Sequence, residues 1–300
     1  MSAVSIAEPL RPHDRPAVIS ISSHVARGTV GNRAVVFALE SLGFPVWSVP
    51  TVTLPWHAGH GKATRIVPPP ADFAALVDDL AGSPWLSEVG AILTGYFGGS
   101  EQVEPAARLV EAVKRANPRA IYLCDPVIGD EGRLYQSQAT LEVIRDRLIP
   151  LADIATPNRF ELELLCGLEL ADNAHIAEAA STLGPDKLLV TSAFPMLRGG
   201  IGNLLVHDFT ALLAEHRSID DAPHGLGDLT AAVFLARILS GLGSEKALQT
   251  TTATVFEILA RTRKRGADEL TVEIDSDSLR HPMAMVQMRR LAFPGGNRRA

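Results

Sequence analysis

The pattern with the clearest chemical potential is a pair of glycines at the start of an expected helix. Gly225 and Gly227 precede Asp228 and a run of small and apolar residues. Glycines let the backbone approach an anion closely, and the unpaired N–H groups of a helix start attract negative charge. Asp228 could then accept the proton of an alcohol while the amides hold a phosphoryl group. The alternative is a plain helix-starting turn, in which Asp228 only favours the helix.

Two aspartates follow an expected buried strand at 120–124. Asp125 comes directly after it, where Pro126 prevents the strand from continuing, and Asp130 lies in a glycine-rich stretch. Mg²⁺ prefers hard carboxylate oxygens and keeps several of its waters. The pattern indicates a place for a metal–nucleotide complex, although an aspartate beside proline also forms turns.

A second acidic position follows the expected strand at 153–156. Thr156 or Asn158 could cap the next helix, and Glu161 lies about one turn into it. An acid favours the helix dipole there, which is a complete structural explanation. Together with the two aspartates, Glu161 could instead contact Mg²⁺ through water.

Hydroxyl and aromatic groups occupy two more strand ends. Thr191 and Ser192 end the expected strand at 187–190, and Tyr96 follows the one at 89–93. The hydroxyls could meet a nucleotide phosphate or only local backbone groups. Tyr96 could stack on an aromatic ring or pack under its own loop.

A glycine-containing loop at 56–62 carries Trp56, His57 and His60. Neighbouring Glu or Cys ligands are missing, which argues against zinc. Because glycines permit movement and Trp56 has a flat apolar face, the loop is interpreted as a mobile flap over a small-molecule pocket.

The elements that must position these groups alternate along the chain. Apolar runs of strand length indicate burial on both faces, and hence a mainly parallel sheet covered by helices. The segments 201–206 and 210–215 predict an antiparallel hairpin at its edge. Ligands of such sheets gather beyond the carboxyl ends of the strands. The other expected strands are 17–21, 46–49 and 64–67, and the expected helices are 34–42, 71–81, 104–116, 141–148, 229–242 and 245–264.

Composition narrows the class of protein. The chain has 300 residues, 46% of them apolar and 21% charged, which suits a large α/β domain. Without a repeat or long linker, we expect one domain at 16–285 between flexible ends at 1–15 and 286–300. The net charge of −6 argues against a nucleic-acid or anionic-membrane partner. No signal peptide or spanning segment is apparent, so a cytoplasmic location is expected.

Taken together, these segments resemble the pyridoxal kinase family of the ribokinase superfamily, from about residue 18 to 270. The resemblance implies a ribokinase-like three-layer α/β sandwich and an ATP-dependent kinase that phosphorylates the 5'-hydroxymethyl group of pyridoxal. It also implies Mg²⁺, a response to K⁺ and a homodimer. The matching blocks, in the family's order, are SHV at 23–25, VGNRA at 30–34, TGYFG at 94–98, CDPVIGD at 124–130, PLADIATPNRFELELLCG at 150–167, VTS at 190–192 and GLGD at 225–228.

Residue roles carry over from the same blocks. The resemblance makes Asp228 the catalytic base and the turn from Gly225 through Leu226 to Gly227 the anion hole. The remaining assignments are Asp125, Asn158, Glu161, Thr191 and Ser192 for ATP, Asp125, Asp130 and Glu161 for the metal, and Ser23, Ala58, Tyr96 and Asp228 for pyridoxal.

Three departures from the family pattern leave the substrate open. Ala58 stands where the family has a threonine that contacts substrate, which can redirect selectivity. Leu226 replaces a threonine or valine, and the lid segment 130–138 is short. The alternatives are a kinase for pyridoxine, hydroxymethylpyrimidine or a sugar, and a catalytically silent pyridoxal-binding protein.

Overall fold

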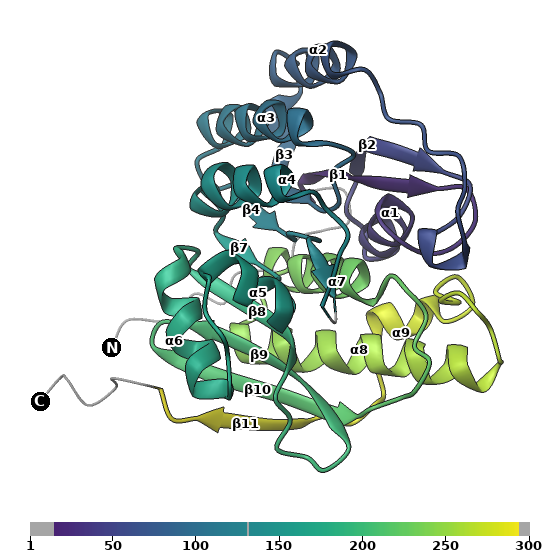
Figure 1. Cartoon of the computed structure of the whole chain (residues 1–300), viewed down its shortest axis with the longest axis vertical. Coiled ribbons are helices and arrows are strands. Elements are labelled where there is room, and N and C mark those ends of the chain that lie inside the picture. Colours follow the sequence, from purple (N-terminus) through teal and green to yellow (C-terminus); the bar gives the residue numbers. More distant parts are fainter. Residues whose placement is uncertain (1–14, 131, 294–300) are drawn as a thin grey trace, which may run out of the picture.

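A computed structural model describes residues 15–130 and 132–293. A nine-stranded sheet runs through it in the order β11-β10-β9-β8-β7-β4-β3-β1-β2 (Figure 1). Strand pairs from β2 to β8 are parallel, whereas β9, β10 and β11 pair antiparallel beyond β8. The predicted mainly parallel sheet with an antiparallel edge is confirmed. The strands are β1 (Ala17–Val25), β2 (Val46–Leu54), β3 (Val89–Thr94), β4 (Ile121–Cys124), β7 (Ile154–Ala155), β8 (Lys187–Ala193), β9 (Gly200–His207), β10 (Thr210–Arg217) and β11 (Gln287–Leu291).

Helices cover both faces of this sheet (Figure 1). One apolar cluster joins the sheet to α2 (Pro70–Ala81), α3 (Val103–Ala116), α4 (Gln138–Val143), α5 (Arg159–Cys166) and α6 (Asn173–Leu183). The other cluster joins it to α1 (Asn32–Ser41), α7 (Leu226–Leu239), α8 (Ser244–Lys264) and α9 (Ser276–Arg280). The strands read as continuous apolar runs because each must bury side chains in both clusters. The predicted three-layer sandwich is confirmed.

The predicted strand at 64–67 is wrong. Ile66 makes one isolated antiparallel bridge to Thr53, with N–O distances of 2.8 and 3.0 Å. Because its side chain is 62% exposed, burial of apolar surface does not stabilise a longer strand here. The segment instead connects β2 to α2, which begins at Pro70, the last of three consecutive prolines.

The predicted tail at 286–300 is also wrong where the structure describes it. Gln287–Leu291 forms β11, the edge strand of the sheet, paired with β10. Glu215 of β10 is fully buried and accepts from Arg289 Nε at 2.6 Å. An edge strand buries little of its own surface, which explains why its polar sequence carried no strand signal. Residues 294–300 lie outside the described part.

The predicted flexible segment at 1–15 falls outside the described residues except for Arg15. That guanidinium donates to the carbonyl of Leu42 at 2.7 Å and lies over the ring of Phe44, so the chain is attached to the domain at this point. Within the described ranges, no helix combines the length and apolarity needed to span a bilayer.

Candidate active site

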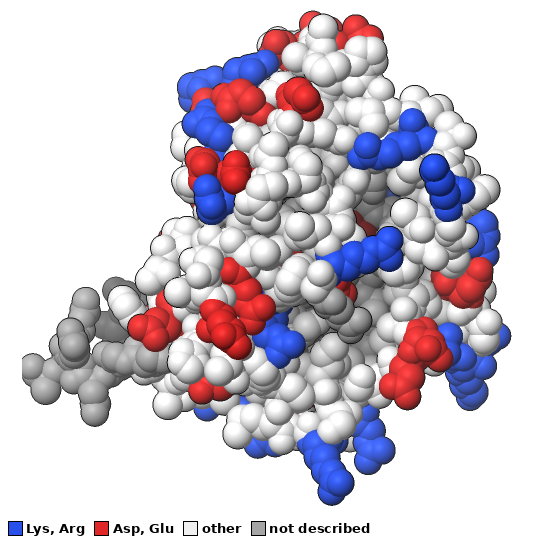
Figure 2. Space-filling model, viewed as in Figure 1, with Lys and Arg blue, Asp and Glu red and all other residues white. Residues whose placement is uncertain are grey.

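Polar groups from five parallel strands meet at one edge of the sheet. The backbone ties neighbouring strand ends together: Gly95 N–H donates to Ile21, and Asp125 N–H donates to Thr94, both at 2.9 Å. Thr191 N–H donates to Pro157 at 3.0 Å. Figure 2 shows this face of the molecule hollowed near its centre, with acidic side chains visible inside the hollow. The sheet therefore gathers the loops that carry the predicted site residues.

Helix α7 (Leu226–Leu239) begins in the glycine turn, three residues before the expected start at 229. Gly225 is the N-cap, with φ of 96°, and no side chain caps the first turn. A Cβ on Gly225 would overlap the carbonyl oxygen of Thr29, so only glycine fits this packed turn. In front of Gly227 there is open space for an approaching group. The turn thus presents uncapped N–H groups to a space that can hold an anion.

Asp228 is the third residue of α7 and is half-buried behind this turn. Burial raises the pKa of its carboxyl to about 6, and the backbone N–H groups of Gly31 and of Asp228 itself partly offset that rise. A carboxyl with this pKa is ionised at neutral pH and still accepts a proton readily. The position combines a proton acceptor with an anion-binding helix start.

Asp125 is buried close to the other acids of the site. Burial, and then the charges of Glu161 and Asp228, raise the pKa of Asp125 well above its ordinary value, while the nearby Thr156 hydroxyl opposes the rise. Like charges held this close favour a bound cation. The donor set therefore fits Mg²⁺ held jointly by protein carboxylates and nucleotide phosphates.

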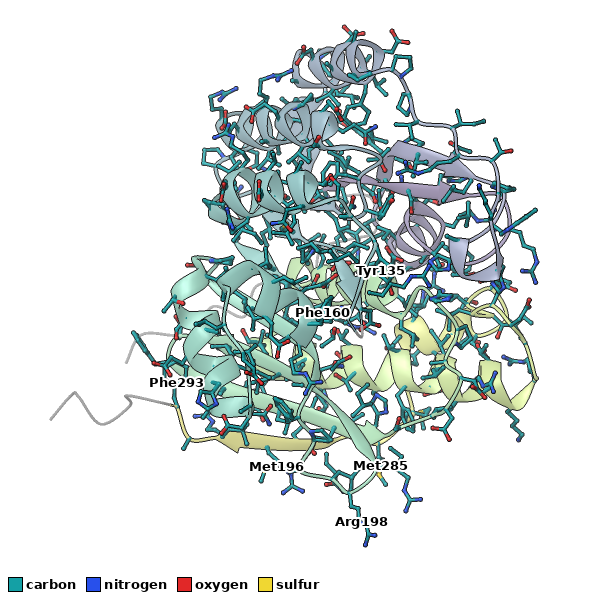
Figure 3. All side chains as sticks on the ribbon, in the orientation of Figure 1. Tyr135, Phe160, Met196, Arg198, Met285 and Phe293 are labelled. Carbon is teal, nitrogen blue, oxygen red and sulfur yellow. The ribbon has the colours of Figure 1, made fainter. Side chains whose placement is uncertain are left out.

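The predicted metal ligands do not form a ready-made cage. Among the residues described, no group of three or more His, Cys, Asp or Glu side chains is placed to hold a metal ion. Asp130 lies in the two-stranded hairpin of β5 (Gly129–Asp130) and β6 (Arg133–Leu134), where its charge raises the pKa of Glu161. Tyr135 and Phe160 lie beside this hairpin (Figure 3). Asp130 thus belongs to the expected lid rather than to the buried acid cluster.

Glu161 and Asn158 form a capping box at the start of α5. Asn158 Oδ1 accepts from Glu161 N–H, and Glu161 Oε2 accepts from Asn158 N–H, both at 2.8 Å. Glu161 Oε1 also accepts from the N–H groups of Ile128, at 2.7 Å, and Gly129, at 3.3 Å. Burial raises the pKa of Glu161 to about 7 despite these three donors. Glu161 therefore fixes the loop after Asp125, and its metal role stays a prediction.

Replacing Glu161 by alanine should lower the free energy of unfolding by at least about 3 kcal/mol, because three buried N–H groups lose their acceptor. Urea unfolding followed by circular dichroism measures this change. Glu111→Ala is the matched control: Glu111 makes only loose ion pairs, at 3.9 Å from Arg115 and from Arg147, so its removal should cost less than about 0.5 kcal/mol. Equal effects of the two substitutions would contradict the role assigned to Glu161.

Thr191 and Ser192 occupy an irregularity in β8. The register between β8 and β9 shifts between Val190 and Ala193, and Ser192 has φ of 54°, which is unusual for a residue with a side chain. Ser192 is exposed and Thr191 half-buried. A bulge of this kind re-aims side chains at a sheet edge. The predicted contact of both residues with ATP remains a prediction.

The predicted substrate residues lie on three separate segments. Ser23 is buried at the end of β1, closely packed against Gly31. Tyr96 is half-buried, and its hydroxyl accepts from Arg65 at 3.1 Å. Ala58 is exposed in a short 3₁₀ turn, Ala58–His60, which lies within the flap. A pyridoxal contact of each of these residues stays a prediction.

His224 and Glu269 are residues of the site that sequence reasoning did not assign to it, and both contact histidines of the flap. The ring of His224 stacks on His57 with centroids 3.9 Å apart, and His60 Nε2 lies 2.9 Å from Glu269 Oε1. Glu269 is more than two hundred residues away from the flap in sequence. No local pattern could have indicated this pairing.

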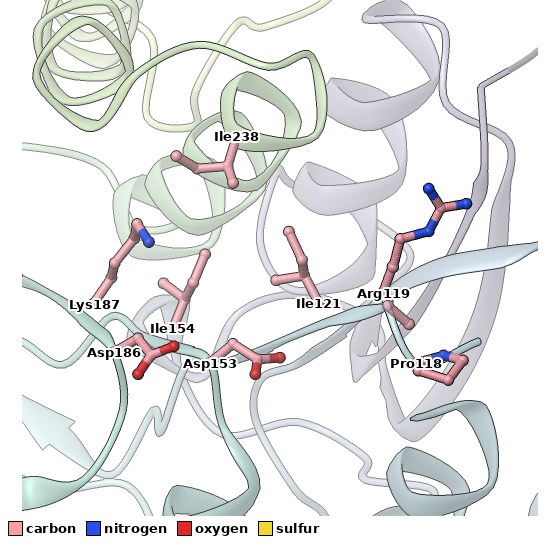
Figure 4. A pocket seen from close by; sticks show the side chains of 9 residues that line it. Pro118, Arg119, Ile121, Asp153, Ile154, Asp186, Lys187 and Ile238 are labelled. Carbon is pink, nitrogen blue, oxygen red and sulfur yellow. The ribbon is translucent and has the colours of Figure 1, made fainter. Parts of the chain in front are cut away.

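A separate pocket of about 260 Å³ lies at the opposite, amino-terminal edge of β4, β7 and β8 (Figure 4). Asp153 and Lys187 line it at the strand starts. None of the predicted site residues contributes to it. The candidate site therefore lies at the carboxyl edge of the sheet and not in this pocket.

Comparison with known proteins identifies the family. A family model described as phosphomethylpyrimidine kinase matches residues 85–273. Pyridoxal kinase PdxY of Rubrobacter xylanophilus is 37% identical over 285 residues, covering 92% of this chain and 97% of that protein. Its counterpart in Corynebacterium diphtheriae is 34% identical, covering 92% of this chain and 99% of that protein.

Solved structures agree over the same extent. Pyridoxal kinase from Entamoeba histolytica has a TM-score of 0.85 and 27% identity, covering 92% of this chain and all of that one. Pyridoxal kinase from Leishmania donovani, in complex with ADP and pyridoxamine, has a TM-score of 0.85 and 29% identity, covering 92% and 99% of the two chains. By sequence and by fold, this chain belongs to the pyridoxal kinase family.

Proposed function

We propose that this protein transfers the γ-phosphoryl group of ATP to the 5'-hydroxymethyl group of pyridoxal, giving pyridoxal 5'-phosphate and ADP. The observation that carries the proposal is the geometry around α7. An ionisable acid, Asp228, and an uncapped glycine turn, Gly225–Gly227, lie within one helical turn of each other. They lie at the sheet edge that also carries the buried Asp125. This pairing suits an alcohol as attacking group and a phosphoryl group as its target.

In this mechanism, Asp228 accepts the hydroxymethyl proton as the oxygen attacks the γ-phosphorus. The N–H groups of the glycine turn hold the phosphoryl oxygens, where negative charge develops. Asp125 and the lid acid Asp130 are the residues that would hold Mg²⁺, with Glu161 keeping their loop in place. A bound Mg²⁺ supplies positive charge to the phosphate oxygens. The new bond between the hydroxymethyl oxygen and the γ-phosphorus replaces the bond between that phosphorus and the β,γ-bridging oxygen, and ADP leaves with the electron pair of the broken bond.

The proposal includes the co-substrate, the ions, the oligomeric state and the cellular location. The structures of relatives include ADP with pyridoxamine and ADP with pyridoxine, which supports ATP as co-substrate and a pyridine ring as acceptor. Mg²⁺, an additional K⁺, a homodimer and a cytoplasmic location are further parts of the proposal, and membership of the family supports them. Metal dependence and light scattering of the purified protein test the first three.

A second candidate substrate is hydroxymethylpyrimidine. The family model over residues 85–273 is described as phosphomethylpyrimidine kinase, and Ala58 in the flap offers no hydroxyl to a substrate ring. Turnover of pyridoxal, pyridoxine, pyridoxamine and hydroxymethylpyrimidine, compared at equal enzyme concentration, distinguishes the candidates. The largest kcat/KM with pyridoxal supports the proposal. Pyridoxal binding without phosphorylation of any substrate would instead identify a catalytically silent protein.

Activity should depend on pH through Asp228. Because burial raises the pKa of this carboxyl to about 6, the base becomes protonated and inactive as the pH falls through that value. We expect kcat/KM for pyridoxal to fall about tenfold per pH unit below this point and to level off above it. Initial rates between pH 5 and pH 8 in buffers of constant ionic strength measure the profile. An acid limb centred near pH 4 would mean that Asp228 is not the titrating group.

A further inference from the structure

The flap, residues 56–62, rests on His224, the residue that directly precedes the anion-binding turn. The rings of His57 and His224 stack with centroids 3.9 Å apart and planes tilted by 37°. His60 meets the same His224 ring edge-on at 6.5 Å. Gly59 lies so close that a Cβ there would overlap the imidazole of His224. The flap backbone and the start of α7 are therefore in direct contact.

The other side of the flap is fixed by a charged group. His60 Nε2 lies 2.9 Å from Glu269 Oε1, and the side chain of Glu269 is only 13% exposed. Arg27 approaches the same carboxylate at 3.3 Å. Within the flap, Gly59 N–H donates to His57 Nδ1 at 3.1 Å and Trp56 Nε1 donates to the Gly61 carbonyl at 3.3 Å. The flap is thus a folded unit with two attachments.

We propose that His224 is a positioning residue for the phosphoryl transfer. Its ring holds the flap against the Gly225–Gly227 turn, and the His60–Glu269 pair fixes the flap's other side. The proposal rests on the proposed function for one point, that the substrate binds between flap and turn. Closure of the flap then excludes water from the reacting groups and orients the substrate hydroxymethyl toward Asp228.

The charges around the histidines make this attachment sensitive to pH. Burial, and then the charges of His224, His60 and Arg133, lower the pKa of His57 to about 4. Burial and the charge of His60 lower the pKa of His224, whereas Glu269 and Asp130 raise it and Arg133 lowers it further. Both rings are therefore neutral at pH 7.5, and each proton taken up places a cation against its neighbour.

These pKa values predict that the flap opens as the pH falls. With the flap open, His57 is expected to titrate near its ordinary pKa of 6.5, and with the flap closed near 4. The closed form binds fewer protons, so the contribution of His57 to closure is fully present above pH 6.5 and is progressively lost as the pH falls toward 4. At pH 5.5 the open form should be favoured about tenfold relative to pH 7.5.

The flap contains its own reporter, Trp56, so the test does not depend on activity. In a Trp47→Phe, Trp85→Phe parent, Trp56 is the remaining tryptophan of the chain. Acrylamide quenching of its fluorescence should increase about twofold on His224→Ala at pH 7.5, and in the parent on lowering the pH to 5.5. His224→Phe keeps a flat ring and should restore the parent value at pH 7.5. The control, His175→Ala, removes an exposed histidine paired with Asp172 and should change nothing.

Kinetics and a double-mutant cycle complete the test. His224→Ala should lower kcat/KM for pyridoxal about tenfold, because binding and orientation of the substrate both depend on the closed flap while the reacting groups remain. Gly59→Ala should disturb the flap more in the parent, where its Cβ overlaps His224, than in the His224→Ala background, where only the milder approach to His57 Nδ1 remains. Equal effects of Gly59→Ala in both backgrounds, or unchanged quenching on His224→Ala, would overturn the proposal.

Failure of the proposed function gives a different result. If quenching responds to His224→Ala while the parent phosphorylates no pyridoxal, the attachment of the flap stands and the substrate assignment is wrong. If the parent phosphorylates pyridoxal and quenching does not respond, the assignment stands and His224 has no positioning role.

Discussion

Asp228→Asn should lower kcat for pyridoxal phosphorylation by at least about 100-fold, because the amide cannot accept the hydroxymethyl proton. Asparagine has nearly the same size, so the first turn of α7 should keep its shape. KM for ATP is expected to stay within about threefold, since the glycine turn and the strand ends that surround it are unchanged. Steady-state rates with coupled detection of ADP provide the measurement.

The control for this substitution is Asp72→Asn. Asp72 is the third residue of α2, as Asp228 is of α7, but it is exposed on a helix far from the sheet edge. Loss of a first-turn acid alone costs only about 0.3–1 kcal/mol of stability and should leave turnover unchanged. Near-wild-type turnover by Asp228→Asn would remove the base from the mechanism. An equal loss in both variants would show that the effect comes from helix stability.

Gly225→Ala is expected to abolish measurable turnover and to lower the free energy of unfolding by at least about 2 kcal/mol. Two causes act together at this residue. Its φ of 96° is strained for any residue with a side chain, and the added Cβ overlaps the carbonyl oxygen of Thr29. The turn must therefore shift, and the N–H groups that hold the phosphoryl oxygens shift with it.

Gly241→Ala separates the two causes. Gly241 also has positive φ, 80°, but a Cβ there meets nothing within 4 Å. It should therefore show a modest loss of stability from backbone strain and nearly normal kinetics. Chemical unfolding and initial-rate assays of both variants give the comparison. If Gly225→Ala retained wild-type kcat, the turn would not be the anion hole.

Family membership and fold, both expected from short blocks of residues, are confirmed. The blocks were informative because the chemistry at a strand end or a helix start depends on a few neighbouring residues. Gly225, Gly227 and Asp228 are adjacent in the chain, and one turn of helix brings their groups together. The alternation of buried strands and helices predicted the layers for a similar reason, because each element buries its own apolar side.

Contacts between residues far apart in the chain could not be predicted in the same way. Glu161 binds the N–H groups of Ile128 and Gly129 more than thirty residues away, and its acidic helix start gave a sufficient local explanation. The polar strand Gln287–Leu291 pairs with the sheet edge, where Arg289 donates to the buried Glu215 of the neighbouring strand, and neither residue reveals its partner. Each of these contacts depends on a residue far away in the chain, and the sequence alone does not identify that residue.

What the sequence determined by itself was the chemistry available: an acid, a glycine turn and carboxylates at strand ends, each specified by local spacing and backbone preference. Only the tertiary structure decided which of these groups share one site. It packed Thr29 against Gly225, placed His224 beneath the flap and brought Glu269 to His60. The physical reason is that such contacts arise from the packing of whole layers, in which distant backbone and side-chain atoms meet without leaving a pattern of residue types.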